Sequence, residues 1–429
     1  MREENLRASS LWMIVGQGVA MAFQAIYFVL IGRTLGSSEY GAFVGIVSLV
    51  AVLSNFSSLG MEMILVRNIS RDRTSFATTW GDSLAVTGLG FLVLLIVAII
   101  FGHFVLRPEL RVLVVYIAFS DGLLGKITQL AARAFQGAGQ LAYTAKLTVL
   151  TNFGRAAMAA VLFAFVHVRG IRADAHVWAK IYWLSTFAVG IVGFVLVTMH
   201  LGWPRFRRLS KSDLFEGVSF SLSSSSISVY NDIDKTFLVS FGMTYAAGIY
   251  TAAYRVIDVV SVPIYSIYAA ATPQMFREGS GGVEQARVWT RKLLRKTVPY
   301  GVVIACILFI AAGWFPYLFG PSFRGSVLAL RWLCLLPLIR VFHYAWGTTI
   351  TASASQWNRT ATQIGAALLN VALNAFLIPR WSWQGAAVAS LLSDGALAVS
   401  NRLVLWHLAR KERRHVRCTS RRQVVSEPA

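Results

Sequence analysis

Apolar stretches of about 20 residues follow one another along nearly the whole chain, and a stretch of that length crosses a bilayer as a helix. They are too long for strands and lack the alternation of an outer-membrane barrel. A helix also satisfies its own backbone hydrogen bonds, as lipid requires. The pattern therefore predicts an all-α polytopic membrane protein. We place about twelve spans, near residues 9–31, 40–61, 80–105, 112–134, 142–167, 177–200, 214–240, 246–275, 297–319, 326–351, 359–379 and 384–408.

The segments between these spans are short, which argues against a soluble catalytic domain. The longest polar pieces are the loop near 276–296 and a basic tail over 409–429. Cys306 and Cys334 lie in apolar stretches and Cys418 lies in the tail, so neither a disulfide framework nor a metal-binding spacing is present. A phosphate-binding Gly-Lys-Ser/Thr loop is also absent. We expect a protein that is not an enzyme and that uses no metal or other cofactor.

Lysine and arginine are concentrated in alternate loops, and this predicts the orientation in the membrane. The chain carries 40 Lys and Arg against 19 Asp and Glu, a formal charge of +21. The basic set of loops lies at 67–73, 205–211, 277–296 and 410–422. Positively charged loops remain in the cytoplasm, so we expect both termini there and an even number of spans. The charge also favours anionic lipid contact. It is spread over separate loops, so nucleic-acid binding is not expected.

A glycine pattern that occurs in both halves of the chain, called the internal echo below, indicates that the chain is duplicated. After the first span, Gly36 is followed by Gly41, two residues before an aromatic. After the seventh span, Gly242 is followed by Gly248 in the same way, with one residue of slippage. Six spans return the chain to the same side, so the pattern predicts two parallel six-helix lobes around a central cavity. We expect the lobes at residues 1–205 and 206–408.

Four basic residues lie deep inside predicted spans: Lys126, Arg155, Arg255 and Arg340. On insertion scales each costs about 2.5–3.5 kcal/mol at the bilayer centre, so four of them facing lipid would cost roughly 10–14 kcal/mol. That is comparable to the whole stability of a typical domain. These side chains must face a hydrated cavity, pair with acids, or do both.

Helical spacing places these basic residues beside other polar side chains. Arg255 and Asp258 lie three apart and can pair along their helix, so an ion pair and a substrate contact are equally open for them. Arg155 and Arg340 have no acid within a helical turn, which favours a role in a cavity. Two helical faces collect polar residues, namely Lys126, Gln129 and Arg133 on one and Thr148, Asn152 and Arg155 on the other.

The seventh span combines serines with acids. Residues 219–228 are rich in serine, which allows helices to pack closely or bend. Acids within spans are candidates for ion coupling, or equally for pairing with an arginine. The candidates are Asp232, Asp234 and Asp258, with Asp121 and Asp394 elsewhere. An inward cationic surface indicates an anionic ligand, because a guanidinium group binds phosphate through two parallel hydrogen bonds.

Three motifs resemble the Wzx-type flippases of bacterial polysaccharide biosynthesis. They lie at 32–43 (G-R-x-L-G-x-x-E-Y-G-x-F), at 248–255 (G-x-Y-x-A-A-Y-R) and at 370–387 (N-x-x-L-N-x-x-L-I-P, then Q-G-A-A). The resemblance covers nearly the whole chain in order. It implies the superfamily of multidrug extruders and the lipid II flippase, with two six-helix lobes around a central cavity.

This resemblance also implies a substrate. Such flippases move an oligosaccharide on undecaprenyl pyrophosphate from the cytoplasmic to the periplasmic leaflet of the inner membrane, by alternating access, for surface polysaccharides such as lipopolysaccharide or exopolysaccharide. The residues agree, since a pyrophosphate needs cations and a sugar needs a polar cavity. We predict that the anionic headgroup is bound by Lys126, Arg155, Arg255 and Arg340. A polymerase or a chain-length regulator is implied as a further partner.

Two other functions remain open. A cation-coupled drug extruder of the same fold would prefer acidic groups in its cavity, because its usual substrates are cations. A polytopic glycosyltransferase or polymerase would carry a long external loop with catalytic acids, and the external loops here are short.

Overall fold

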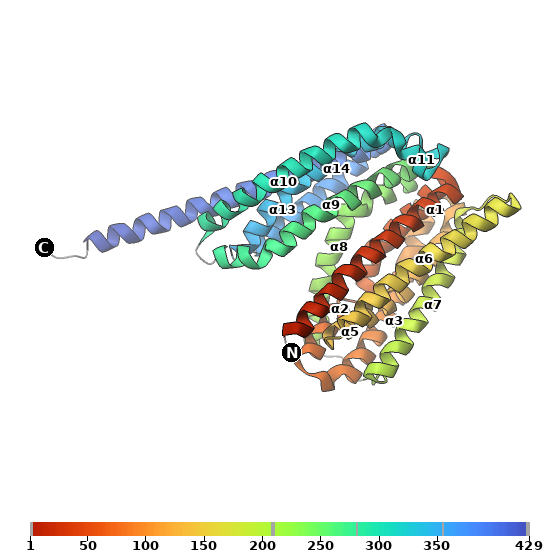
Figure 1. The fold of residues 1–429 in the computed structure, drawn as a ribbon, viewed down its shortest axis with the longest axis horizontal. Coiled ribbons are helices and arrows are strands. Elements are labelled where there is room, and N and C mark those ends of the chain that lie inside the picture. Colours follow the sequence, from red (N-terminus) through yellow and green to blue (C-terminus); the bar gives the residue numbers. More distant parts are fainter. Residues whose placement is uncertain (1–2, 207–210, 280–281, 354–355, 426–429) are drawn as a thin grey trace. The chain divides into compact units, whose positions relative to one another are not determined.

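The computed structural model describes residues 3–206, 211–279, 282–353 and 356–425, and within them every regular element is a helix (Figure 1). Four short pieces join longer helices: η1 (Arg73–Ser75), the π-helical η2 (Ala118–Leu124), η3 (Ala312–Trp314) and η4 (Pro321–Phe323). The longer helices are α1 (Glu3–Ser57), α2 (Met61–Arg71), α3 (Phe76–Val105), α4 (Pro108–Ile117), α5 (Gly125–Gly137), α6 (Leu141–Arg169), α7 (Ala175–Leu201), α8 (Lys211–Ser240), α9 (Thr244–Gly279), α10 (Val283–Ala311), α11 (Phe315–Phe319), α12 (Ser326–Leu333), α13 (Leu336–Ala352) and α14 (Gln356–Val425).

Eight helical segments of the described chain are long and apolar enough to cross a membrane. Two of them, Trp12–Ser57 and Trp357–Arg413, contain a kink and are long enough for two crossings each. The kinks lie at Gly36, with φ +74°, and at Ser382, with φ +52°. The run from α4 to α5 and helix α8 match two further predicted spans and carry more charge. The protein is therefore the all-α polytopic membrane protein that the sequence predicts.

The chain forms two compact units. The first comprises Met1–Ile249 with Pro316–Arg324, and the second comprises Tyr250–Phe315 with Gly325–Ala429. Helix α8 belongs to the first unit, so this division differs from the lobes expected at 1–205 and 206–408. The lobes expected from the internal echo therefore stay a prediction. The expected tail begins inside α14, which continues to Val425.

In the first unit, α8 packs along α1 through polar contacts. Ser225 Oγ donates a 2.6 Å hydrogen bond to the carbonyl oxygen of Val52, and Asn55 Nδ2 donates to Ser228 Oγ at 2.9 Å. The serine-rich segment of the predicted seventh span therefore does contribute to close helix packing.

Two glycines of the internal echo, Gly41 and Gly248, lie against each other in this unit. Gly36 and Gly242 both adopt left-handed backbone conformations, with φ of +74° and +75°. A Cβ atom on Gly41 would collide with the carbonyl oxygen of Thr244 and approach the backbone of Gly248. The start of α9 and the second half of α1 can therefore touch only because both positions lack a side chain.

Two charged residues of the first sequence motif hold backbone groups rather than line a cavity. Arg33 Nε donates to the carbonyl oxygen of Leu318 at 2.6 Å. Glu39 Oε2 accepts from the backbone N–H of Ala175 at 2.9 Å and so caps the start of α7. These contacts satisfy helix-end groups that have no partner within their own helices.

The second unit is built around α9, α10, α13 and the second half of α14. Ile264, Val341 and Ala345 form part of a buried core cluster. Hydroxyl pairs add polar links between the helices, with Tyr268 Oη 2.9 Å from Thr297 Oγ1 and Thr290 Oγ1 2.6 Å from Thr349 Oγ1.

Candidate functional site

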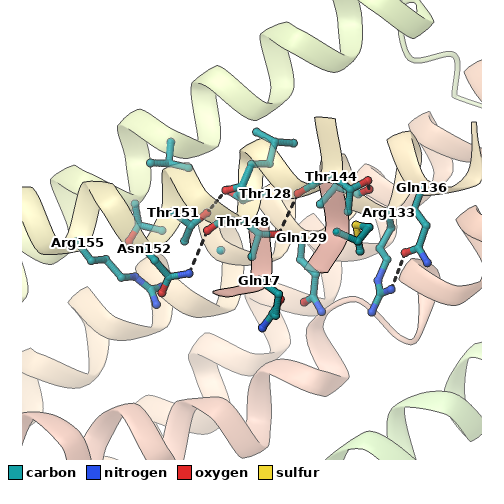
Figure 2. Close-up of a pocket in the computed structure, with 16 residues that line it drawn as sticks. Gln17, Thr128, Gln129, Arg133, Gln136, Thr144, Thr148, Thr151, Asn152 and Arg155 are labelled. Carbon is teal, nitrogen blue, oxygen red and sulfur yellow. Dashed lines mark hydrogen bonds between the residues drawn. The ribbon is translucent and has the colours of Figure 1, made fainter. Parts of the chain in front are cut away.

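A polar cavity of about 360 Å³ lies in the first unit among α1, α5, α6 and α7 (Figure 2). None of the described residues that line it is acidic. Figure 2 shows the labelled side chains in a row beside α6. Arg155 and Asn152 of α6 lie at one end of the row, and Arg133 and Gln136 of α5 lie at the other. The polar lining consists of Gln17, Thr128, Gln129, Arg133, Gln136, Thr144, Thr148, Thr151, Asn152, Arg155 and Thr186.

Helical periodicity brings this lining together. On α6 the polar residues recur at spacings of three and four, which places them on one face. The hydroxyl of Thr148 donates to the carbonyl oxygen of Thr144 at 2.9 Å, and Asn152 Nδ2 donates to that of Thr148 at 3.0 Å. Each of these two side chains therefore has a backbone acceptor within α6 for a hydrogen bond that it donates. Their oxygens remain able to accept hydrogen bonds from a ligand hydroxyl.

Arg155 is held at the cavity by an acid and an aromatic ring. Its Nη2 lies 3.1 Å from Asp121 Oδ1, and its guanidinium lies 4.7 Å from the centre of the Tyr182 ring. Tyr182 Oη donates to the same Asp121 oxygen at 2.7 Å. The Nε atom of Arg155 is buried and has no hydrogen-bond partner among the described residues. Arg155 therefore keeps donor capacity beyond its bond to Asp121.

Asp121 owes its position to a local irregularity of the helix. It lies in the π-helical segment η2, between α4 and α5. Single π-helical turns within α-helices occur frequently at functional sites, because the extra residue redirects the side chains around it. No pattern in the sequence predicts this turn, although the sequence analysis did name Asp121 as a candidate acid.

Lys126 does not join Gln129 and Arg133 in the cavity lining. Its Nζ lies 2.9 Å from Glu62 Oε1, and Ser58 Oγ donates to the same oxygen at 2.8 Å. Both charged side chains are nearly buried, with 8% and 11% of their area exposed. Lys126 therefore sits in a closed ion pair behind the cavity wall, and its part in headgroup binding stays a prediction.

In the second unit, Arg340 is at the centre of a buried polar cluster. Its Nη2 donates to Tyr254 Oη at 2.7 Å, and its Nη1 lies 3.3 Å from Asp258 Oδ1. Its Nε lies 3.6 Å from Asp394 Oδ2. Arg340 has no acid within a turn of its own helix, and its acidic partners come from α9 and α14 instead. Arg255 pairs with Asp258 at 3.6 Å, as its spacing allowed.

The acids of α8 are paired as well. Asp232 Oδ1 lies 2.7 Å from the nearly buried ammonium of Lys235, and Asp234 Oδ1 lies 3.8 Å from it. Both acids therefore lie against a lysine of their own helix, whereas the expectation was pairing with an arginine. Their part in ion coupling stays a prediction.

One cluster was missed at the sequence level. Arg67 on α2 binds two acids at the start of α8, with Asp213 Oδ1 2.7 Å from Nη2 and Glu216 Oε2 beside Nη1. The sequence placed Arg67 in a basic loop that sets orientation. Its partners lie about 150 residues away, beyond the reach of any local pattern.

A family model described as polysaccharide biosynthesis protein matches residues 6–278, more than half of the chain. The chain belongs to this family. The resemblance seen in the sequence motifs is thereby confirmed. No curated protein matches the sequence.

Solved structures show which fold this member of the polysaccharide biosynthesis family adopts. It is similar to an inward-facing multidrug resistance MATE family transporter of the MOP superfamily, with 17% identity, a TM-score of 0.69, and coverage of 93% of this chain and 99% of the other. The lipid II flippase MurJ, in an inward closed conformation, gives 10% identity, a TM-score of 0.73 and coverage of 92% and 87%. A MOP superfamily transporter from Pyrococcus furiosus gives 16% identity, a TM-score of 0.59, and coverage of 94% of this chain and 96% of the other. The protein therefore has the MOP superfamily fold.

Proposed function

We propose that this protein is a flippase for a lipid-linked oligosaccharide, and that the cavity of the first unit receives the polar headgroup. The observation that carries the proposal is the chemistry of the lining, which combines two arginines with amides and hydroxyls and contains no acid. Guanidinium groups suit phosphate oxygens, whereas amides and hydroxyls suit the hydroxyls of a sugar. A ligand that carries both groups would use the whole lining.

In this proposal Arg155 exchanges one anion for another. Asp121 holds the guanidinium before the substrate arrives. A phosphate oxygen can then compete with Asp121 for the Nη2 bond. Two negative charges brought into a space of low dielectric need such compensation. Arg133, whose Nη1 donates to Gln136 Oε1 at 2.7 Å, supplies a second cation at the other end of the cavity.

Family membership and fold support a specific substrate class. The family model is one of polysaccharide biosynthesis, and one structural neighbour is a lipid II flippase. We therefore extend the proposal to an oligosaccharide on undecaprenyl pyrophosphate, carried from the cytoplasmic to the periplasmic leaflet of the inner membrane by alternating access. Arg255 and Arg340 of the second unit are proposed to take part in headgroup binding. Asp232 and Asp234 of the first unit and Asp258 of the second are proposed to take part in coupling.

A multidrug extruder is the second candidate, because MATE transporters share the fold. The two candidates differ in the sign of the ligand charge. A cationic drug would meet Arg133 and Arg155 in a cavity whose lining offers no acid.

Purified protein in liposomes decides between the two functions. We expect translocation of a pyrophosphate-linked glycolipid and no uptake of a cationic dye. Arg155→Gln should lower glycolipid translocation at least tenfold, since a charge-assisted hydrogen bond contributes about 1.5–3 kcal/mol. Lys180→Gln, an exposed position on α7, is the matched control and should leave the rate unchanged. Dye uptake without glycolipid movement would overturn the proposal.

A further inference from the structure

A second cavity, of about 400 Å³, lies in the second unit between α10, α13 and α14, three helices that run side by side (Figure 1). We call it the arginine groove. Three arginines line it: Arg287 and Arg291, one turn apart on α10, and Arg402 on α14. Trp346 and Trp406 lie in the same lining. None of the described lining residues is acidic.

The arginines of this groove are incompletely neutralised. Arg287 pairs with Glu284 at 3.1 Å along α10. Arg291 and Arg402 have no acid within ion-pair distance among the described residues, and both are exposed. Arg402 instead lies over the ring of Trp346, with its guanidinium carbon 5.2 Å from the ring centre. The groove therefore offers at least two positive charges to a ligand.

The rest of the groove is apolar. Leu294 lies one turn beyond Arg291 on α10, and Val399 and Leu403 lie on α14. Val399 and Leu403 are largely exposed on a helix that crosses the membrane, as is Trp406, so this side of the groove faces lipid. Tryptophan is enriched where the headgroups meet the hydrocarbon. The groove thus joins a cationic end to an apolar wall at the edge of the membrane.

From this arrangement we infer that the arginine groove binds an anionic phospholipid, with its phosphodiester between Arg291 and Arg402 and its acyl chains along Leu294, Val399 and Leu403. Basic pockets between membrane-spanning helices recognise anionic headgroups in this way. Charge complementarity selects the occupant, because a zwitterionic headgroup would bring its own cation next to the arginines. The polar headgroup cavity of the first unit plays no part in this inference.

Native mass spectrometry of the purified full-length protein tests it, with phosphatidylglycerol and phosphatidylcholine offered together in micelles. A basic side chain near an anionic surface contributes roughly a fivefold gain in affinity. We therefore expect the wild-type protein to retain phosphatidylglycerol in preference to phosphatidylcholine. Arg291→Gln combined with Arg402→Gln should lower that retention roughly 30-fold. Arg402→Lys, which keeps the charge, should preserve most of it.

Arg331→Gln is the matched control, since Arg331 also lies over an aromatic ring, that of Phe309, but outside the groove. It should leave retention unchanged. An unaltered Tm in phosphatidylcholine verifies that each variant is folded, and the single Arg291→Gln variant replaces the double one if that Tm falls. Equal retention of both lipids, or an equal loss in Arg331→Gln, would overturn the inference. Displacement of phosphatidylglycerol by equimolar undecaprenyl phosphate would also overturn it, because the groove would then select the polyprenyl lipid.

Discussion

Arg155 and Lys126 are both deep, basic and paired with an acid, yet their surroundings differ. Lys126 and Glu62 are nearly buried, and neither of them lies in the cavity lining. Arg155 lies in that lining, has 23% of its side chain exposed, and keeps an unbonded Nε. A closed pair contributes to the fold, whereas an open one can also exchange partners with a ligand.

The first prediction separates folding from transport at Arg155. Arg155→Ala leaves Asp121 without its cation, and removing one partner of a buried pair costs about 3–5 kcal/mol, a figure that partial exposure reduces here. The double variant Arg155→Ala, Asp121→Asn removes both charges. We expect it to return to wild-type amounts in the membrane and still export no surface glycan. Immunoblots of membrane protein and of surface glycan measure the two quantities, and normal export in the double variant would remove Arg155 from the site.

The second prediction gives Lys126 the opposite behaviour. Lys126→Met should lower the amount of folded protein, because it leaves the Glu62 carboxylate buried with Ser58 as its remaining partner. Adding Glu62→Gln should restore both the folded protein and a substantial part of glycan export. Thermal unfolding in detergent and the export assay follow the two effects. Recovery of folding without any export would instead place Lys126 in substrate binding.

At the scale of the elements, glycines set how closely helices approach. Gly41 on α1 and Gly248 on α9 lie at matching places of the internal echo and meet backbone to backbone. Gly16 has the same effect where α1 meets α6, since a Cβ there would lie 2.7 Å from that of Ala145. These contacts position α1, which contributes Gln17 to the cavity.

The third prediction follows from the contact of α1 with α9. Gly41→Ala and Gly248→Ala each force a methyl group into a carbonyl oxygen, so each should lower the Tm or prevent accumulation of the protein. Gly88→Ala on α3 is the control, because no heavy atom lies within 4 Å of a Cβ at that position. Fluorescence-detected size exclusion after a heat step reports the remaining folded protein. Equal stability of all three variants would refute the close contact.

Sequence periodicity predicted the helices well and their internal breaks poorly. Apolar length marks a span wherever it occurs, so the spans agree with the observed helices. The π-helical turn that carries Asp121 has no comparable signature. Its charge made Arg155 a candidate for the cavity, whereas Gln17 and Thr186 were not predicted to line it. Neutral polar residues in a span equally indicate helix packing.

At the scale of the whole molecule, partners distant in sequence limited what could be predicted. Arg340 meets Asp394 and Asp258 only because α9, α13 and α14 pack together, and no spacing within one helix reveals that. Twelve spans and their order follow from hydropathy, whereas the fit of one helix face to another depends on tertiary packing. The orientation in the membrane is a property of the whole chain that the sequence does predict.

The fourth prediction tests that orientation by cysteine labelling from outside intact cells. The background replaces Cys306, Cys334 and Cys418 by alanine. Gln285 is exposed near the start of α10, in the basic segment that should face the cytoplasm, and Arg172 is exposed between α6 and α7, in a segment that should face outward. We expect a membrane-impermeant maleimide to label Arg172→Cys and to leave Gln285→Cys unlabelled until the cells are opened. Five predicted spans separate N-terminal residues from Arg172, and eight separate them from Gln285, so the two positions must lie on opposite sides if the span count is right. Labelling of both from outside would contradict the span count, whereas the reversed pattern would contradict the assignment of both termini to the cytoplasm.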